Sequence, residues 1–236
     1  MNIAFIPVRG GSKSIPLKNI KLFNGKPLVF WTAKSAQNAH CIDKIVIATD
    51  SPEIKSIVLS FGFEKLEVFD RNAKNAEDTS STESVMLEYI DKSNLNNDDL
   101  FFLIQATSPM LKSEHIEGMY KNFITNKCDS MFTGVIEKQF HWDTGEKINS
   151  DVSAKDFYNG VKPINYDYKN RPRRQDFDGL IAENGACYIN SIKNIKKDKC
   201  RLSGKIGAYV LPSYTSYEID ESADFIIVEE LMKKLH

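Results

Sequence analysis

The stretch RGGSKSIPLKN, which begins at Arg9, places three cations and two adjacent glycines directly after the first apolar run of the chain. Gly10 and Gly11 can adopt positive φ and can expose their backbone N–H groups. Arg9, Lys13 and Lys18 bring positive charge to the same loop. Backbone donors combined with long cationic side chains suit a ligand that carries several phosphates. The loop is therefore a candidate phosphate-binding site.

The spacing within this loop argues against two common nucleotide-binding motifs. GxxxxGK[ST] requires Gly-Lys after four intervening residues, and GxGxxG is absent. Neither a P-loop NTPase nor a Rossmann dehydrogenase is indicated. One plain alternative stays open at this point, namely a solvated basic loop that needs its glycines only for a turn.

The elements around the loop predict a parallel sheet. Apolar runs of strand length alternate with amphipathic segments of helical spacing. Expected strands cover residues 3–8, 44–49, 66–69 and 99–105, and expected helices cover 27–40, 51–62 and 81–92. Uniformly apolar strands that alternate with helices favour a parallel sheet covered on both faces. Ligands bind at the carboxyl ends of such strands, where the glycine loop lies.

Capping signals mark the starts of two of these helices. Ser51 is a candidate N-cap with Pro52 at the first helical position. Ser80 and Glu83 have the spacing of a capping box for the helix over 81–92. These signals predict where the two helices begin.

The regular pattern stops between Gln139 and Ile181, where aromatic, polar and basic residues mix without a period. A long unpatterned segment that retains many aromatics is more typical of an inserted arm or binding loop than of a disordered linker. Strands then resume at 185–191 and 205–211, followed by a helix over 221–235. We expect a single domain over 1–236 with an insertion at about 138–182.

Composition limits the class of protein. With 236 residues, 42% of them hydrophobic, and a net charge of −1, the chain can bury one substantial core. Near-neutral charge gives no support for a nucleic-acid or membrane partner. No apolar run reaches 18 residues, and a cytoplasmic location is expected. The histidines lack ligand spacing, and no CxxC pair occurs among the cysteines, which are Cys41, Cys128, Cys187 and Cys200.

Seven stretches of the sequence carry a family resemblance. They are IPVRGGSKSIPLKNI, TDSPEI, DTSST, LIQATSP, RPRRQDFDG, ENGACYI and SYEID. In content and order they resemble the blocks of the CMP-sialic acid synthetases, or acylneuraminate cytidylyltransferases, whose loop commonly reads IPARGGSKGIPxKN. The resemblance covers nearly the whole chain. It implies an α/β, Rossmann-like, three-layer and mostly parallel fold of the nucleotide-diphospho-sugar transferase type, with an inserted dimerisation arm.

The same resemblance implies a reaction and its nucleotide site. CMP would be transferred from CTP to the anomeric hydroxyl of a nonulosonic acid, with release of pyrophosphate. Arg9 and Lys18 would act catalytically by neutralising charge on the departing pyrophosphate. The implied nucleotide contacts are Arg9, Gly10, Gly11, Ser12, Lys18, Asn19, Arg71, Ser81 and Thr82. A plain helix-capping role stays open for the hydroxyls at positions 80 to 82.

A Mg²⁺ ion held by carboxylates is implied as well. Glu218 and Asp220 alternate along an expected extended segment, so both side chains should point to one side. Asp220 is the implied catalytic metal ligand, Glu218 its neighbour and Asp50 a possible helper. Asp220 and Asp50 have capping as an alternative role. The family usually carries Asp at position 218 and Gly at position 14, where this chain has Glu218 and Ser14.

The resemblance also implies five residues that contact the acceptor sugar, namely Gln105, Thr107, Arg173, Asn184 and Tyr188. A guanidinium such as that of Arg173 suits a sugar carboxylate. The expected acceptor is N-acetylneuraminate. Legionaminate, pseudaminate and Kdn stay open, and Kdo is ranked lower because that branch of the family lacks the RPRRQ block.

Arg171 and Arg174 are expected to be solvated or to contact a second subunit. A homodimer is expected through the aromatic insertion around Phe140, Trp142 and Tyr158. A non-catalytic nucleotide or sugar binder is the alternative from another class.

Overall fold

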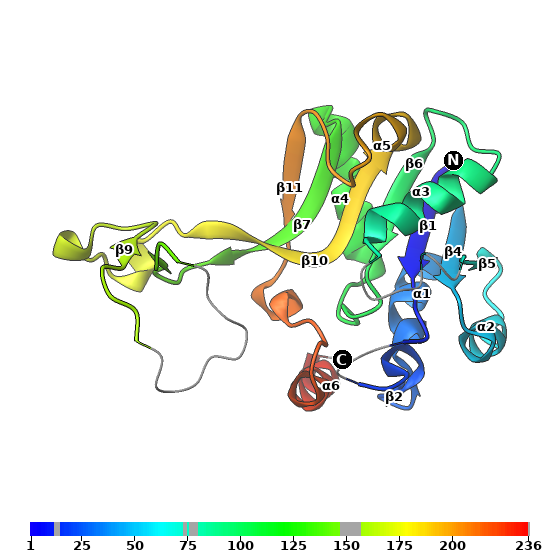
Figure 1. The fold of residues 1–236 in the computed structure, drawn as a ribbon, viewed down its shortest axis with the longest axis horizontal. Coiled ribbons are helices and arrows are strands. Elements are labelled where there is room, and N and C mark those ends of the chain that lie inside the picture. The colour runs from blue at the N-terminus through cyan, green and yellow to red at the C-terminus, as the bar shows by residue number, and fades with distance from the viewer. Residues whose placement is uncertain (12–14, 73–74, 76–79, 147–156, 236) are drawn as a thin grey trace. The chain divides into compact units, whose positions relative to one another are not determined.

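The structure is a computed structural model that describes residues 1–11, 15–72, 75, 80–146 and 157–235. Its centre is a seven-stranded sheet in the order β11-β7-β10-β6-β1-β4-β5 (Figure 1). The strands are β1 (Asn2–Pro7), β4 (Lys44–Thr49), β5 (Leu66–Asp70), β6 (Leu100–Ile104), β7 (Ser130–Glu137), β10 (Leu180–Ser191) and β11 (Ile206–Val210). Strand β1 pairs in parallel with β4 and β6, and β4 with β5, whereas β10 runs antiparallel to β6. The predicted mostly parallel sheet is confirmed.

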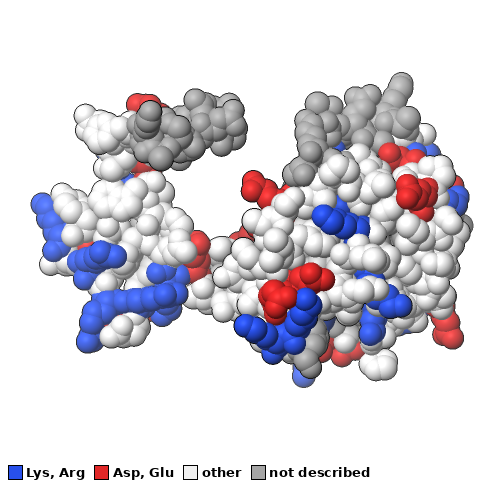
Figure 2. Space-filling view, turned by 90° about the horizontal axis from the view of Figure 1, so that it is seen from below, with Lys and Arg blue, Asp and Glu red and all other residues white. Residues whose placement is uncertain are grey.

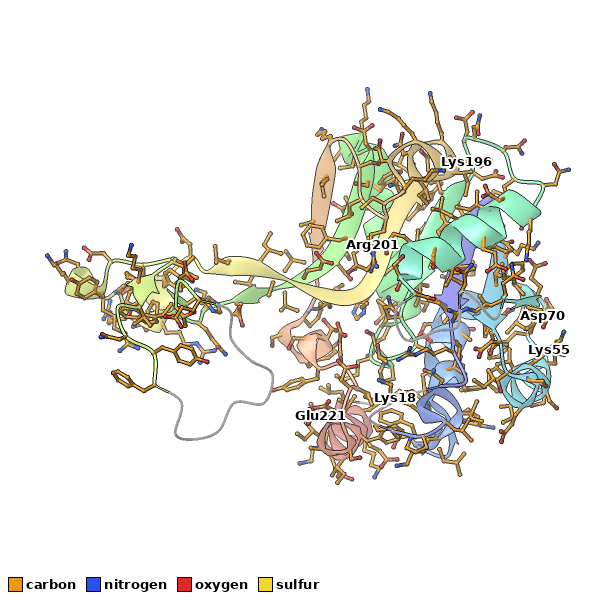
Figure 3. The ribbon with its side chains drawn as sticks, in the orientation of Figure 1. Lys18, Lys55, Asp70, Lys196, Arg201 and Glu221 are labelled. Atoms are coloured by element: carbon orange, nitrogen blue, oxygen red, sulfur yellow. The ribbon has the colours of Figure 1, made fainter. Side chains whose placement is uncertain are left out.

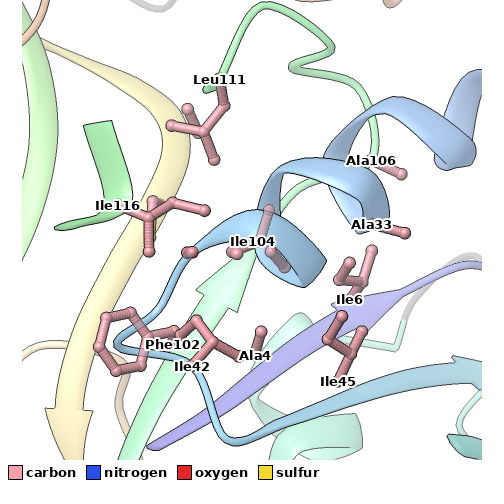
Figure 4. Packing of buried hydrophobic residues seen from close by; sticks show 14 of the residues in the cluster. Ala4, Ile6, Ala33, Ile42, Ile45, Phe102, Ile104, Ala106, Leu111 and Ile116 are labelled. Carbon is pink, nitrogen blue, oxygen red and sulfur yellow. The ribbon is translucent and has the colours of Figure 1, made fainter. Parts of the chain in front are cut away.

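Helices cover both faces of this sheet. They are α1 (Leu28–Asn38), α2 (Pro52–Leu59), α3 (Thr82–Lys92), α4 (Ser113–Asn126) and α5 (Ile192–Asp198). A further helix, α6 (Ser222–Leu235), lies at the C-terminal end. Alternate strand residues face different helices. Ala4 and Ile6 belong to a buried cluster that includes residues of α1, α2 and α4 (Figure 4). Ile3 and Phe5 belong to a second cluster with residues of α3 and α5. The result is the expected three-layer arrangement.

Short elements precede α1 and α6 in the chain. They are η1 (Lys18–Ile20), β2 (Leu22–Phe23), β3 (Lys26–Pro27) and η5 (Ser213–Ser216). A third apolar cluster joins Phe23 and Leu28 to Phe225 and Val228 of α6. Burial of these side chains holds the C-terminal helix against the segment that follows the glycine loop.

The structure corrects one detail and adds elements that the pattern did not identify. The N-cap of α3 is Ser81, whose hydroxyl accepts from the N–H of Ser84, so the capping box expected at Ser80 and Glu83 is wrong by one residue. Helix α4, strand β7 and helix α5 were not expected from the sequence. Ser51 caps α2 as predicted, by accepting from the N–H of Ile54.

The chain divides into two compact units, one of residues 1–135 and 183–236 and the other of residues 136–182. The sequence places the insertion at about 138–182. In the second unit β8 (Trp142–Asp143) pairs with β9 (Lys162–Pro163), and η3 (Tyr168–Asn170) and η4 (Arg174–Asp176) follow. The ring of Phe140 stacks on that of Tyr166 with centroids 4.2 Å apart. Aromatic packing thus gives this unit a small core of its own.

Among the residues that the structure describes, no helix is both long enough and apolar enough to cross a membrane.

Candidate functional site

A cavity of about 310 Å³ opens at the carboxyl ends of β1, β5 and β6 in the first unit. Pro7 is the last residue of β1, Arg71 follows β5, and Gln105 follows β6. Its walls carry Pro7, Arg9, Gly11, Lys18, Asn19, Arg71, Ser80, Ser81, Thr82, Val85, Gln105, Ala106 and Thr107. The fold therefore brings the glycine loop, the start of α3 and the end of β6 to one place.

Lys18 and Asn19 reach the cavity from η1. Leu17, which precedes this short helix, has a left-handed conformation with φ of 51°. The Asn19 side chain is buried, and its Nδ2 donates to the carbonyl of Arg9 at 3.3 Å. Lys18 Nζ donates to the carbonyl of Ile219 at 2.7 Å. These bonds hold both side chains between the glycine loop and the segment before α6.

The N-terminus of α3 forms another wall. Ser81 Oγ accepts from the N–H of Ser84 at 3.1 Å, so the capping role that the sequence left open is present. Ser81 and Thr82 also line the cavity. A helix N-terminus carries partial positive charge and unpaired N–H groups, which favour an anionic ligand. Together with Arg9, Lys18 and Arg71, it makes the cavity attractive to phosphates.

Arg71 is partly buried in the cavity wall. Its backbone N–H donates to the carbonyl of Thr49 at 3.0 Å, and its guanidinium donates through Nη2 to the carbonyl of Asn75. Its Nε is buried and has no hydrogen-bond partner among the described residues. Burial is the main cause that lowers the pKa of Arg71, and the nearby charge of Arg9 adds to it, whereas Asp50 acts in the opposite direction. A buried donor without a partner is costly, and an anion in the cavity would relieve that cost.

The acidic segment at 218–220 lies beside Lys18. Asp220 Oδ1 is 3.2 Å from Lys18 Nζ, and Ile219 between the two acids is fully buried. Burial raises the pKa of Glu218 to about 7, with further contributions from the charges of Asp220 and Glu183. The two carboxylates are therefore close enough to repel each other, as expected for neighbouring metal ligands.

Gly185 makes room for Glu218. Its φ is +67°, and a Cβ added there would collide with the Glu218 carboxylate. The glycine in ENGACYI thus has a backbone and a packing reason. Any other residue at position 185 would force the Glu218 carboxylate to shift.

Asp50 is held by the glycine loop. Its carboxylate accepts from the N–H of Gly10 at 3.0 Å. Gly10 is not among the described residues that line the cavity, and its N–H donates to Asp50; its expected contact with the nucleotide stays a prediction. Over the ranges that the structure describes, no group of three or more His, Cys, Asp or Glu side chains is arranged to hold a metal ion. Glu218 and Asp220 come together, but Asp50 does not complete a three-carboxylate set.

Two residues expected on the acceptor side, Asn184 and Tyr188, are buried and have internal hydrogen-bond partners. Asn184 is 3% exposed, and its amide is bonded to Thr133 and Thr215, with Thr133 Oγ1 donating to Oδ1 at 2.7 Å. Tyr188 is 4% exposed and donates through its hydroxyl to the Glu183 carboxylate. Neither lines the cavity. Buried polar groups need such partners, and this requirement accounts for both side chains.

Arg173 belongs to the second unit. It is exposed, and its Nε donates to Asp176 at 2.6 Å. A concave surface of about 580 Å³ there is lined by Lys138, Gln139, Phe140, Arg171, Pro172, Arg173 and Arg174. The Arg171 guanidinium lies 4.7 Å from the centroid of the Phe140 ring, so Arg171 is packed within this unit. Figure 2 shows Lys and Arg side chains gathered on part of the surface of the second unit.

Other residues of the site are either new or outside the described ranges. Ser12 and Ser14 lie outside the residues that the structure describes. Ser80, Val85 and Ala106 line the cavity but were not assigned to the nucleotide or acceptor site from the sequence. Val85 follows Ser81 and Thr82 by one helical turn, and this spacing is a signal that could have placed it on the same face of α3.

Comparison with known proteins agrees with this geometry. The family described as Cytidylyltransferase matches residues 3–177. The chain is 34% identical over 230 residues to an N-acylneuraminate cytidylyltransferase of Oncorhynchus mykiss, covering 96% of this chain and 49% of the relative. It is 27% identical to a pseudaminic acid cytidylyltransferase of Campylobacter jejuni subsp. jejuni serotype O:2, covering 100% of this chain and 97% of the relative. The chain thus spans about half the length of its N-acylneuraminate cytidylyltransferase relatives.

Solved structures show the same fold. The structure of a CMP:2-keto-3-deoxy-manno-octonic acid synthetase complexed with CTP superposes with a TM-score of 0.68 at 19% identity, over 100% of this chain and 99% of that one. A 4-diphosphocytidyl-2C-methyl-D-erythritol synthase gives a TM-score of 0.68 at 11% identity, over 98% of this chain and 97% of that one. With the matched sequence family, these comparisons show that the chain belongs to the cytidylyltransferase family.

Proposed function

We propose that this protein is an enzyme that transfers CMP from CTP to the anomeric hydroxyl of a nonulosonic acid and releases pyrophosphate. The observation that carries the proposal is the cavity where Arg9, Lys18 and Arg71 meet the N-terminus of α3 at the carboxyl edge of the sheet. Two groups of relatives, the N-acylneuraminate and the pseudaminic acid cytidylyltransferases, support the choice of a nonulosonic acid.

In the proposed reaction, the oxygen of the anomeric hydroxyl attacks the α-phosphorus of CTP, and the hydroxyl proton passes to solvent. The new O–P bond forms as the bond from the α-phosphorus to the bridging oxygen of the β-phosphate breaks, and pyrophosphate leaves with the bonding electrons. Arg9 and Lys18 stabilise the charge on the departing group. Asn19, Ser81, Thr82 and Gln105 offer hydrogen-bonding groups to the nucleotide and the acceptor from the same cavity.

Magnesium is part of the proposal. Mg²⁺ is commonly bound through one or two carboxylates together with substrate phosphates. Glu218 and Asp220 form a mutually repelling pair beside Lys18, and this donor set fits such an ion. When bound, the ion would supply additional positive charge for the triphosphate. Asp220 is more accessible than Lys18, with 70% of its side chain exposed against 11% for Lys18, which suits a carboxylate that receives a ligand from solution.

N-acetylneuraminate is the first acceptor to test, followed by pseudaminate, legionaminate, Kdn and Kdo. Identity favours the N-acylneuraminate relatives, whereas coverage favours the pseudaminic acid relatives, whose length the chain nearly equals. We also propose that the protein is a cytoplasmic homodimer, with the second unit at residues 136–182 as the arm that joins the copies. Arg173 in that unit is proposed to meet the acceptor carboxylate.

The function is tested by measuring pyrophosphate release from CTP and Mg²⁺ with each of the five acceptors in parallel. Release with one nonulosonic acid establishes the reaction and identifies the acceptor. Tight binding of CTP with no release from any acceptor would contradict the proposal and favour a non-catalytic nucleotide binder. Ser14 and Glu218, where the chain departs from the family pattern, would then be the positions to revert.

A further inference from the structure

Glu88 is a buried carboxylate on α3 that does not line the cavity. It is 9% exposed and accepts three hydrogen bonds: from the N–H of Asn72 at 3.0 Å, from Asn75 Nδ2 at 2.6 Å and from Lys92 Nζ at 2.7 Å. Burial opposes ionisation of Glu88, but the hydrogen bonds from Lys92, Asn75 and Asn72 outweigh it and hold the pKa below its ordinary value. Glu88 is therefore an ionised and well-bonded group within the core.

These bonds connect Glu88 to Arg71. The guanidinium of Arg71 donates to the carbonyl of Asn75, and the N–H of Asn75 donates to the carbonyl of Asn72 at 2.9 Å. Glu88 thus binds Asn72 and Asn75, which follow Arg71 in the chain, and the carbonyl of Asn75 receives the guanidinium. With its Nδ2 on Glu88 and its carbonyl facing Arg71, Asn75 is the link between the carboxylate and the cation.

The charges point in the same direction. Arg71 and Arg9 both line the cavity, and burial and the charge of Arg9 both disfavour the Arg71 cation. The negative charges of Asp50 and Glu88 favour that cation. Glu88 is not among the described residues that line the cavity, so its charge favours the Arg71 cation without being part of the cavity wall.

We propose that Glu88 is a positioning residue for the nucleotide: it holds Asn72 and Asn75 and thereby sets Arg71 for contact with CTP. The inference rests on the proposed function, since it takes CTP as the ligand of the cavity. A plain alternative is that Glu88 only stabilises α3 through its pair with Lys92 four residues later. The two roles differ in what they do to nucleotide binding.

The test compares Glu88→Gln with the matched control Lys92→Met. Glutamine keeps the size of the side chain but loses its charge and one acceptor. We expect Glu88→Gln to weaken CTP binding by about tenfold, because hydrogen bonds to charged groups are among the stronger ones. The KM for the acceptor should stay within about twofold. Lys92→Met removes the helix pair but keeps the bonds to Asn72 and Asn75, so CTP binding should stay within about twofold.

A double-mutant cycle decides whether Glu88 acts through Arg71. The dissociation constant of CTP with Mg²⁺ is measured by calorimetry for the native protein, Glu88→Gln, Arg71→Ala and the double variant. In the Arg71→Ala background, Glu88→Gln should cause no further loss. If Glu88→Gln does not fold, Asn75→Ala removes the side-chain link and takes its place, with an expected loss of about threefold to tenfold for CTP.

Three results would overturn the inference while leaving the proposed function in place. They are unchanged CTP binding in Glu88→Gln, an equal loss in Lys92→Met, or additive losses in the cycle. Absence of CTP binding by the native protein would be a different outcome, since it would overturn the proposed function and the inference together. Thermal unfolding of each variant confirms that the folded protein is being measured.

Discussion

The cavity and the acidic segment at 218–220 are neighbouring parts of one unit, but different kinds of contact hold their polar and charged side chains. In the cavity wall, the hydroxyl of Ser81 accepts a hydrogen bond from the N–H of Ser84, three residues later, and the amide of Asn19 donates to the carbonyl of Arg9. The acids depend on distant partners, since Lys18 and Asp220 are separated by 202 positions. Figure 3 shows Lys18 beside the start of α6, which Glu221 precedes.

This difference shows how the two parts acquire their chemistry. A cap or a turn creates a local binding group wherever its short motif occurs. The raised pKa of Glu218 arises only when β10 and the segment before α6 come together, because burial and the charges of Asp220 and Glu183 cause it. Substitutions that separate local from distant contacts therefore test the comparison directly.

Lys18→Met should have the largest effect, because Lys18 takes part in both regions. Loss of one preorganised cation for a departing phosphate is expected to lower kcat by about 10²- to 10³-fold. Lys55→Met is the matched control, since Lys55 forms an exposed pair with Asp70 outside the cavity and should change kcat by less than about twofold. Steady-state kinetics with saturating CTP measures both. Equal rates for Lys18→Met and the native protein would show that Lys18 only anchors the acidic segment.

Asp220→Asn should have the second-largest effect on activity. Removal of a metal-binding carboxylate is expected to raise the Mg²⁺ concentration for half-maximal activity by at least about tenfold. Glu221→Gln removes a charge from the exposed neighbouring residue and serves as the control. A Mg²⁺ titration of pyrophosphate release provides the measurement. An unchanged Mg²⁺ requirement in Asp220→Asn would remove this residue from the metal site.

Arg173→Ala tests whether contacts to the acceptor also lie outside the first unit. The KM for the sugar should rise by about 10- to 100-fold, and the KM for CTP should change much less, because the guanidinium suits a sugar carboxylate. Arg174→Ala is the adjacent control with the same change of charge. Initial rates with each substrate varied separately give both constants. A parallel rise in both would mean that Arg173 does not meet the sugar.

Glu218→Gln should stabilise the metal-free protein in a pH-dependent way. The pKa of Glu218 is about 7 in the folded protein against an ordinary value of 4.5. The folded state therefore keeps a proton that the unfolded chain releases, and the free energy of unfolding falls as pH rises from about 4.5 to 7. Glutamine avoids this loss.

After allowance for screening by solvent, we expect Glu218→Gln to gain about 1–2 kcal/mol at pH 8 and much less at pH 5. Urea unfolding with a metal chelator at both pH values measures the difference. The same gain at pH 5 and pH 8 would show that a cause other than the Glu218 charge is responsible.

Ser81→Ala should have the smallest effect and no such pH dependence. Loss of the cap on α3 is expected to lower the free energy of unfolding by about 1 kcal/mol. If Ser81 also contacts the nucleotide, the dissociation constant of CTP rises; if it only caps the helix, CTP binding stays the same. Urea unfolding and calorimetry separate the two. Ser84→Ala, with a hydroxyl that donates to the carbonyl of Ser81, is the control on the same turn.

Much of the fold was predictable because it follows from short-range patterns. The apolar run KIVIAT coincides with β4, and the Ser51–Pro52 signal coincides with the start of α2. The start of α3 was misplaced by one residue because three consecutive hydroxyl residues, from Ser80 to Thr82, can each act as a cap. Helix α4 and strand β7 were missed between the TSP turn and the insertion, although Ile116, Met119 and Phe123 have helical spacing.

The site was less predictable where a polar side chain could bind either a ligand or another group of the protein. Asn184 and Tyr188 stand at positions that resemble a sugar site, yet both are buried: Asn184 bonds to Thr133 of β7, and Tyr188 bonds to Glu183 of its own strand, β10. Gly10 resembles an anion-binding glycine but donates to Asp50. For Glu88 the sequence signals only the pair with Lys92 four residues later, because Asn72 and Asn75 lie 16 and 13 residues earlier in the chain.

The sequence by itself determined the alternation of strands and helices, the caps and the cationic glycine loop. These depend on periodicity and on hydrogen bonds within one or two turns of chain. Only the tertiary structure decided that Arg9 and Lys18 line one cavity, that Lys18 meets Asp220, and that Glu218 is partly buried beside Gly185. Such pairings depend on the order of strands in the sheet and on the removal of charged groups from water, and neither is encoded in local spacing.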